Sequence, residues 1–305
     1  MNGVQMTAYI AGGVRLALPV LFAAAGELVS ERAGVLNLSL EGMMLTGAFA
    51  ASAASSATGS ALVGVGAGML AALLFAAGQA FFTVKAGANQ LVVGIAANAF
   101  ALGLTSFAAR RLFGDGAGDK LAGFDQVQIP VLHRLPLVGE GLFGQSSLAY
   151  IGVLLVAFTL LVLRHTGWGL AVTAVGEDAQ AADRAGTPVR AVRTLAILWT
   201  GAMAGFGGAF IALADVHAFT PNMTAGRGYL AIVAVIAGAW RGPRVVVACM
   251  VFGAAAALQF QAGALGIHVP VALLVMSPYL LALLAVAGLV GRQRPPRNLT
   301  APFVR

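Results

Sequence analysis

An acid and three amides lie within stretches of this sequence that are otherwise apolar. Asn37 and Glu41 belong to the stretch 26–51, and Gln90 and Asn98 belong to a second stretch further along the chain. A carboxylate in the middle of a bilayer costs about 2.5 to 3.5 kcal/mol, so such a group normally faces a partner or a watery path. If both stretches are helical, spacings of four and eight residues put the members of each pair on one face. Two interpretations stay open: the four side chains bind a polar solute, or they bridge neighbouring helices and hold them in register.

Motifs for catalysis are absent from the sequence. It contains no HExxH, no GxSxG, no paired intramembrane aspartates and no GxxxxGK[ST] loop for binding a nucleotide. Cys249 is the only cysteine, so the chain forms no internal disulfide and no thiolate metal cluster, and the four histidines form no metal motif. We therefore expect no enzyme, no bound metal and no cofactor, and any ATP hydrolysis has to come from a separate subunit.

The composition indicates which elements must position these side chains. Of the 305 residues, 59% are hydrophobic and 10% are charged, whereas a soluble domain is about one quarter charged. Blocks of roughly 20 apolar residues suffice to cross a bilayer as helices, and these blocks lack the alternation of a membrane barrel. We predict an all-α fold, a polytopic transmembrane helical bundle of about nine to ten spans forming a single domain over 1–305. The blocks are 16–29, 36–54, 61–84, 90–108, 148–163, 194–214, 229–240, 243–265 and 268–290.

Small residues recur at helical spacing within these blocks. Gly64, Gly68 and Ala72 form one such series, and Gly201 and Gly205 belong to another. In a bilayer the hydrophobic effect does not draw helices together, so small residues that permit close backbone approach are favoured at contacts. Most of the 40 glycines are therefore expected to serve packing alone.

The net charge of +7 is distributed as the positive-inside rule requires, so we expect contact with membrane lipid and none with nucleic acid. If the segment 164–193 is cytoplasmic, the loop 109–147 is external and the tail 291–305 is cytoplasmic. Twelve basic residues then lie inside and five outside. The inner set is Arg32, Lys85, Arg164, Arg184, Arg190, Arg193, Arg241, Arg244, Arg292, Arg294, Arg297 and Arg305, and the outer set is Arg110, Arg111, Lys120, Arg134 and Arg227.

The inner segment 164–193 contains the signals of a short helix over 177–185. Glu177 and Asp178 suit its amino end, Arg184 suits its carboxyl end, and Gly186 followed by Pro188 ends it.

A helix of this length is not stable alone, so it must be buried against something. Ala179 and Ala182 would form an exposed small face that fits a groove on another protein. The alternative is a surface helix packed on its own bundle.

Two further groups of polar residues have simpler interpretations. Glu27 and Glu31 lie near a predicted inner end, where we expect them to be solvated. Asp215 and His217 follow a span and are expected to mark the water interface.

The segment from Ala174 to Leu213, AVGEDAQAADRAGTPVRAVRTLAILWTGAMAGFGGAFIAL, resembles the coupling region and following helix of ABC importer permeases. The similarity is to the branch that contains branched-chain amino acid, ribose-type sugar and nucleoside permeases. In that branch the Gly-Glu-(Asn/Asp)-x-x-Ala-Ala motif forms a coupling helix that sits in a cleft of the ATPase subunit. The resemblance implies this role for Gly176, Glu177, Asp178, Ala179, Ala182 and Gly186, with Asp178 where asparagine is commoner.

Three more stretches resemble the nucleoside or simple-sugar permeases of this branch: ERAGVLNLSLEGMML (31–45), ANQLVVGIAANAFALGLT (88–105) and FTPNMTAGRGYLAIVAVIAGAWRGPR (219–244). The resemblance implies a permease of the cell inner membrane that receives a nucleoside or related sugar-like solute from an external solute-binding lipoprotein. It also implies an ATPase partner and a second homologous permease, or a second copy of this chain. The polar face of Asn37, Glu41, Gln90 and Asn98 would then border the path of a ribose hydroxyl or nucleobase. Alternatives are an ABC permease for another sugar or a branched-chain amino acid and, in a different class, an ion-driven secondary transporter.

Overall fold

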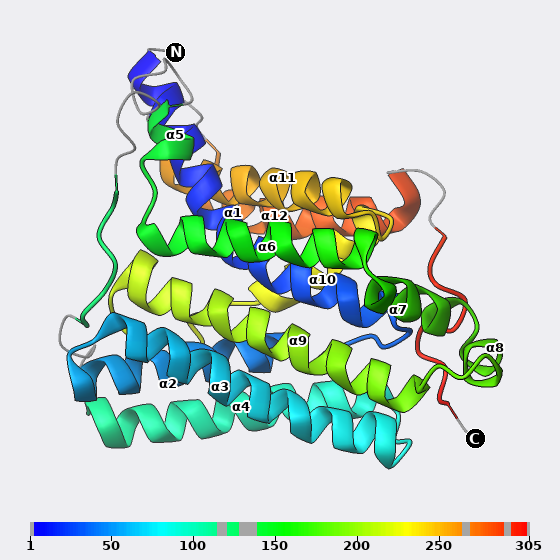
Figure 1. Ribbon diagram of the computed structural model, residues 1–305. Helices are drawn as coiled ribbons and strands as arrows, with labels where there is room; N and C mark the ends of the chain where they lie inside the picture. The colour runs from blue at the N-terminus through cyan, green and yellow to red at the C-terminus, as the bar shows by residue number, and fades with distance from the viewer. Residues whose placement is uncertain (1–2, 115–120, 128–138, 264–268, 290–293, 304–305) are drawn as a thin grey trace.

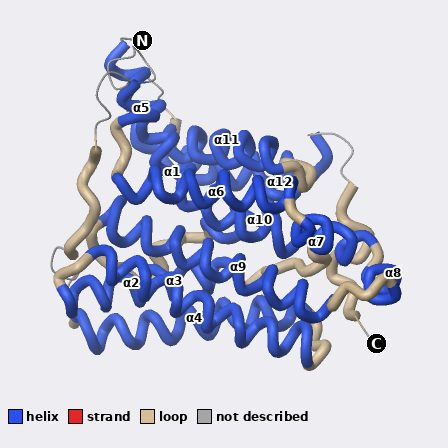
Figure 2. Tube along the Cα trace, in the orientation of Figure 1, coloured by secondary structure: helices blue, strands red, loops and turns tan. Residues whose placement is uncertain are grey.

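The computed structural model of the protein describes residues 3–114, 121–127, 139–263, 269–289 and 294–303. Within these residues every regular element is a helix, as the tube in Figure 2 shows, and the β-type pairing is limited to an isolated bridge between Gln126 and Ser146. The predicted all-α class is confirmed.

Each of the nine apolar blocks coincides with a helix. In chain order these helices are α1 (Gly3–Arg32), α2 (Leu40–Thr58), α3 (Ala61–Ala80) with the π-helical turn η1 (Phe81–Lys85), α4 (Gln90–Phe113), α6 (Ser147–His165), α9 (Val189–Phe210) with η3 (Ile211–Val216), α10 (Arg227–Ala237), α11 (Gly242–Gln261), and α12 (Val271–Leu284) with η4 (Ala285–Leu289). Three short helices, α5 (Gly139–Phe143), α7 (Gly167–Glu177) and α8 (Ala179–Arg184), lie between them.

By length and composition, six helices in the described part of the chain can cross a membrane: α1, α3 with η1, α4, α6, α9 with η3, and α11. α10 and α12 are apolar but shorter. A short apolar helix beside full-length spans begins or ends inside the bundle, which places its terminal backbone groups among side chains rather than in water.

The core is built around α9, which packs against α1, α2 and α3. Backbones approach closely because the contacting positions lack side chains: a Cβ at Gly208 would lie 2.0 Å from the Met44 carbonyl oxygen, and one at Gly205 would lie 2.6 Å from that of Gly68. Phe22 packs edge-on against Phe206 and Phe210, with distances between ring centroids of 5.1 and 5.5 Å. The predicted role of small residues in helix packing is confirmed at these positions.

The two long connections lie at opposite ends of the bundle. Figure 1 places the start of α1 and α5 at one end, and α7, α8 and the residues that precede the carboxyl terminus at the other. α4 continues to Phe113, beyond the expected start of the loop 109–147. Beyond it, the Leu121 and Phe124 amides donate to the His217 and Leu213 carbonyls, which fasten the loop to the end of α9 and η3. Residues 115–120 and 128–138 of this loop, and 290–293 and 304–305 near the end of the chain, lie outside the described residues.

Candidate functional site

Glu41 lies in the first turn of α2 and binds the beginning of α10. Its Oε1 accepts hydrogen bonds from the Thr224 hydroxyl at 2.6 Å and the Gly226 amide at 2.7 Å, and its Oε2 accepts from the Gly228 amide at 2.7 Å. The residue is only 8% exposed. Both carboxylate oxygens therefore have partners within the chain.

This arrangement follows from the position of the α10 amino terminus inside the bundle. The first amides of a helix have no partner within the helix, and the helix dipole makes this end positive. Glu41 supplies both the acceptors and the negative charge. The contact needs a glycine at 228, because a Cβ there would lie 2.5 Å from the Glu41 amide nitrogen.

Asn37 does not share a helical face with Glu41. It lies in the irregular segment between α1 and α2, where its backbone N–H donates to Glu27 Oε1 at 2.9 Å. Its own Oδ1 accepts from the Ser39 hydroxyl at 2.8 Å, and the residue is fully buried. The expected face was wrong because α2 begins only at Leu40, so a spacing of four does not correspond to one helical turn here.

Gln90 and Asn98 both lie on α4, and both bind the segment 36–42, which covers the end of the connection and the first turn of α2. Gln90 Oε1 accepts from the Leu36 amide at 3.0 Å, while Asn98 accepts from the Gly42 amide at 2.8 Å and donates to the Leu38 carbonyl at 2.7 Å. Their predicted shared face is confirmed. Together they satisfy backbone groups of 36–42 that would otherwise lack partners in an apolar surrounding.

Part of this network reaches the molecular surface. Asn98 Nδ2 also lies 2.7 Å from the Tyr229 hydroxyl, and the Tyr279 hydroxyl donates to the Ala225 carbonyl at 2.6 Å. Tyr229 and Tyr279 are 44% and 40% exposed, whereas Asn98 is half-buried. We call Asn98, Tyr229 and Tyr279 the polar edge, because a side of the bundle formed by α4, α10 and α12 carries them.

Glu27 and Glu31 are fully buried, which corrects the expectation that they are solvated. They contact each other on α1. Trp240 donates its indole N–H to Glu31 Oε2, while Glu27 Oε2 and Glu31 Oε1 have no hydrogen-bond partner among the described residues. The expectation was wrong because the turn after α1 and the connection between α10 and α11 fold over this end of the helix.

The predicted helix 177–185 is divided in two. Glu177 ends α7, a helix that sequence reasoning missed, and the shorter α8 covers only Ala179–Arg184. Asp178 separates them as the N-cap of α8, with its Oδ1 accepting from the Ala181 amide at 2.9 Å. Gly186 ends the motif with a left-handed φ of 86°. The missed signal for α7 was Thr166, whose hydroxyl caps the helix by accepting from the Gly169 amide.

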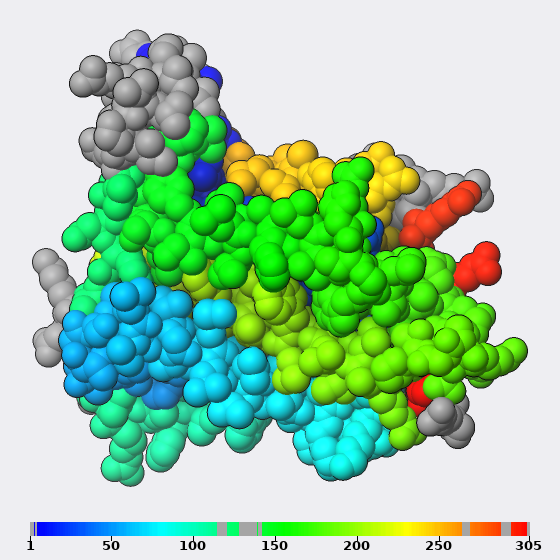
Figure 3. Space-filling model, in the orientation of Figure 1, coloured from blue at the N-terminus to red at the C-terminus, as the bar shows by residue number. Residues whose placement is uncertain are grey.

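The small face of α8 is not exposed. Ala179 and Ala182 retain only 4% and 6% of their accessible surface, because they pack against the rest of the same chain. Gln180, Ala181 and Arg184 point outward instead. Figure 3 shows this segment projecting from one end of the bundle. Of the two interpretations for the alanines, packing on the parent bundle is therefore the one observed.

A family model described as branched-chain amino acid transport system / permease component matches residues 9–288, nearly the whole chain. The chain belongs to this family of ABC importer permeases. It is 38% identical over 259 residues to the putative glucose ABC transporter permease protein of Haloferax volcanii, covering 83% of this chain and 77% of the relative. It is 32% identical to the guanosine ABC transporter permease protein of Bacillus subtilis over 95% of this chain and 94% of the relative.

A third relative, the nucleoside ABC transporter permease protein of Lactococcus lactis, is 30% identical over 92% of this chain and 91% of the relative. No solved structure matches the chain. The family confirms that the protein is a transporter permease of the cell membrane and not an enzyme. As an ABC permease it acts with an ATPase subunit and a binding protein.

Four residues that contact Glu41 or Asn98 were not singled out from the sequence of this permease: Thr224, Gly226, Gly228 and Tyr229. A signal existed, since a glycine-rich turn precedes a block too short for a full span, which is the pattern of a discontinuous membrane helix. The partner of that turn is 183 to 187 residues away in the sequence. Only the folded chain brings it to Glu41.

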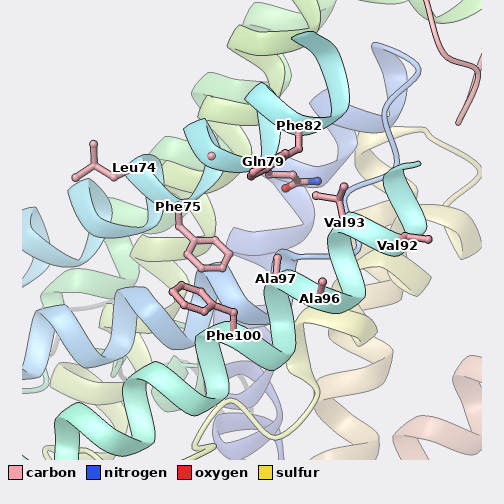
Figure 4. Close-up of a pocket in the computed structure, with 10 residues that line it drawn as sticks. Leu74, Phe75, Gln79, Phe82, Val92, Val93, Ala96, Ala97 and Phe100 are labelled. Atoms are coloured by element: carbon pink, nitrogen blue, oxygen red, sulfur yellow. The ribbon is translucent and has the colours of Figure 1, made fainter. Parts of the chain in front are cut away.

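The permease also has a cavity of about 490 Å³ between α3 and α4. Figure 4 shows Phe75 and Phe100 stacked at one side of it, with Val93 and Ala97 lining the α4 wall. Gln79 is its single polar side chain. A cavity of this chemistry suits hydrocarbon, not a hydroxylated solute.

Proposed function

We propose that this permease carries a nucleoside or a related sugar-like solute into the cell, received from an external binding lipoprotein and driven by a separate ATPase. Two of the relatives are named for guanosine and for nucleosides, and a third for glucose. Solutes of all these classes present several ring hydroxyls that exchange hydrogen bonds with amides and phenols. The similarity to the guanosine and nucleoside permeases over more than nine-tenths of this chain is the observation that carries the proposal.

The solute path runs along the polar edge, between this permease and a second, homologous one. Asn98, Tyr229 and Tyr279 already bond within the chain, but the Tyr229 hydroxyl keeps a hydrogen to donate and the Tyr279 hydroxyl keeps lone pairs to accept. On a membrane-embedded side this remaining capacity favours a polar solute over lipid. Asn98 and Tyr229 offer donors and acceptors there. Glu41, Asn37 and Gln90 are buried behind them and hold the wall of this path in place.

The ATPase docks at the end that carries α8. This end also carries most of the basic residues, which supports a cytoplasmic location for it. The loop 109–147, at the opposite end, is then external. The outward side chains of α8 form the contact, while Ala179 and Ala182 seat the helix on the permease. Gly176, Glu177, Asp178 and Gly186 set the direction of α8 through its cap and its exit.

Transport in proteoliposomes tests the solute and the energy source together. The permease is reconstituted with its ATPase, its second permease and its binding protein, and ATP-dependent uptake of labelled guanosine, glucose and leucine is measured with an uncoupler present. We expect guanosine uptake, reduced at least about tenfold by Asn98→Ala and unchanged by Leu104→Ala, an exposed apolar position on the same helix. Uptake of leucine alone, or uptake that needs an ion gradient and no ATPase, would refute the proposal.

Docking is tested by Ala181→Trp, which adds bulk to the exposed side of α8. We expect the ATPase to be lost from the purified complex, while Ala57→Trp, at an exposed position near the end of α2 where Ser55 bonds Ala122 of the loop 109–147, retains it. Retention of the ATPase by the α8 variant would place its docking site elsewhere.

A further inference from the structure

The described residues after η4, 294–303, fold back onto the bundle at the end that carries α8. We call them the terminal segment. Leu299 and Phe303 pack against the buried core, and Pro296 is buried. The segment is shaped by two local bonds, from the Leu299 amide to the Pro296 carbonyl and from the Ala301 amide to the Asn298 carbonyl. It is therefore an ordered turn with its own fixed contacts.

Two backbone bonds join the terminal segment to two distant elements. The Asn298 amide donates to the Gly176 carbonyl at 2.9 Å, and the Thr300 amide donates to the Gly34 carbonyl at 3.1 Å. Gly176 lies in the last turn of α7, directly before α8, whereas Gly34 lies in the connection from α1 to α2. Residues 298–300 thus link the end of α7, which leads into α8, to the connection that contains Asn37.

Arg193, at the start of α9, strengthens the same junction. Its Nε donates to the Ala33 carbonyl at 3.2 Å, and its Nη1 donates to the Ala301 carbonyl at 2.9 Å. The side chain is 3% exposed, and its guanidinium group donates hydrogen bonds to carbonyls of two separate segments. A guanidinium presents several donors in a fixed plane, so it can hold both carbonyls at once, which a lysine cannot do in the same geometry.

Close approach at the junction requires glycine on both sides. A Cβ at Gly34, whose φ is 84°, would lie 2.9 Å from the Asn298 carbonyl oxygen, and a Cβ at Gly176 would lie 2.0 Å from that of Arg32. With no side chains between them, these backbones are in direct contact. A displacement at one of them moves the other, because packed backbone cannot be compressed.

From Gly34 the connection leads to the candidate path. Gln90 and Asn98 hold this connection and the first turn of α2 at Leu36, Leu38 and Gly42. Glu41, in that turn, holds the start of α10. Thr300 and Pro302 also line a small cavity with 87–91, beside the start of α4. The terminal segment thus contacts the elements on both sides of this network.

We propose that the terminal segment is a positioning element for transport: it transmits the displacement of α7 and α8 to the connection between α1 and α2, with Arg193 holding the two together. Rigid packed elements with hydrogen-bonded contacts carry such coupling. The inference rests on the proposed docking of the ATPase at α8, and it assigns the transmission step to residues outside the docking surface.

The test uses the full transporter complex with a permease that lacks residues 297–305. We expect the truncated permease to retain the ATPase and its basal ATP hydrolysis, while stimulation by the loaded binding protein and solute uptake each fall at least about tenfold, through the loss of three hydrogen bonds. Arg297→Ala is the matched control, since this exposed residue lies in the same segment and its substitution leaves the backbone bonds in place.

Two further variants keep the outcome decisive if the truncated chain does not assemble. Leu299→Ser with Phe303→Ser loosens the segment within the full chain, and Arg193→Lys weakens the junction while it keeps the charge. Full stimulation in the variants that assemble would overturn the inference, and so would loss of the ATPase together with basal hydrolysis in all three. Failure of the docking proposal gives a different result, because the complex with Ala181→Trp would then keep both the ATPase and full uptake.

Discussion

Two sites on neighbouring helices bury acids in opposite ways. Glu41 has both carboxylate oxygens bound, by one hydroxyl and two amides at 2.6 to 2.7 Å. Glu27 and Glu31 face each other, and each leaves one oxygen without a partner in the described structure. The first site therefore joins two helices through a carboxylate, whereas the second holds two acids in contact that repel each other when both are charged.

The difference shows that burial alone does not define the role of an acid in a membrane protein. The cost of removing an acid depends on the donors that lose their acceptor, because an unsatisfied buried donor costs about 1 to 3 kcal/mol. Three donors depend on Glu41. Among the described side chains one donor, the Trp240 indole, depends on Glu31, so we expect a much smaller cost there.

The largest effect is expected from Glu41→Leu. Three donors at the start of α10 would lose their acceptor in an apolar surrounding, so we expect a loss of about 3 kcal/mol or more of stability. The measurement is the temperature at which half of the purified permease remains monodisperse in detergent. Glu177→Leu, at an exposed acid, is the control. Equal stability of the Glu41 variant and the wild type would show that the hydrogen bonds between Glu41 and the start of α10 do not stabilise the fold.

A smaller effect is expected from Gly228→Ala, which disturbs the same contact between Glu41 and the start of α10 from the α10 side. The added methyl group would lie 2.5 Å from the Glu41 amide nitrogen, and overpacking of this kind costs about 1 to 3 kcal/mol. Gly103→Ala is the matched control, because nothing lies within 4 Å of a Cβ there. Alanine at an open helical position stabilises by about 0.5 to 1 kcal/mol, so the two variants should shift the same detergent measurement in opposite directions.

The smallest effect is expected from Glu31→Gln. The amide keeps an oxygen for the Trp240 N–H and offers an N–H₂ group to Glu27, and it removes the repulsion between two buried acids. We expect stability within about 1 kcal/mol of the wild type. Glu41→Gln, measured in parallel, should cost more, because its amide hydrogens would face backbone amides. If the order of these two glutamine variants is reversed, the contrast between the two sites is wrong.

The sequence by itself determined the class of the protein. Blocks of apolar residues must form helices in a bilayer, because only a helix or a closed barrel satisfies every backbone group there. The nine helices that coincide with the blocks follow from this constraint. The close contact between Gly205 and Gly68 follows from a second one, since small residues at helical spacing are favoured where helices meet in a bilayer. The coupling motif identified the permease family from residues alone, and Gly186 marked the end of the predicted helix correctly, whereas its start was misplaced because Glu177 belongs to α7.

Only the tertiary structure decided the partners of the polar residues. Periodicity describes one helix at a time, so it could not show that Asn37 precedes α2 or that Ala179 and Ala182 pack inward. The donors to Glu41 come from a turn more than 180 residues away, and Glu27 and Glu31 are buried by other connections of the chain. The hydrogen-bonding capacity of a side chain is set by its chemistry, but the groups that satisfy it are set by which backbones the fold brings within 3 Å, and a linear sequence does not contain that distance.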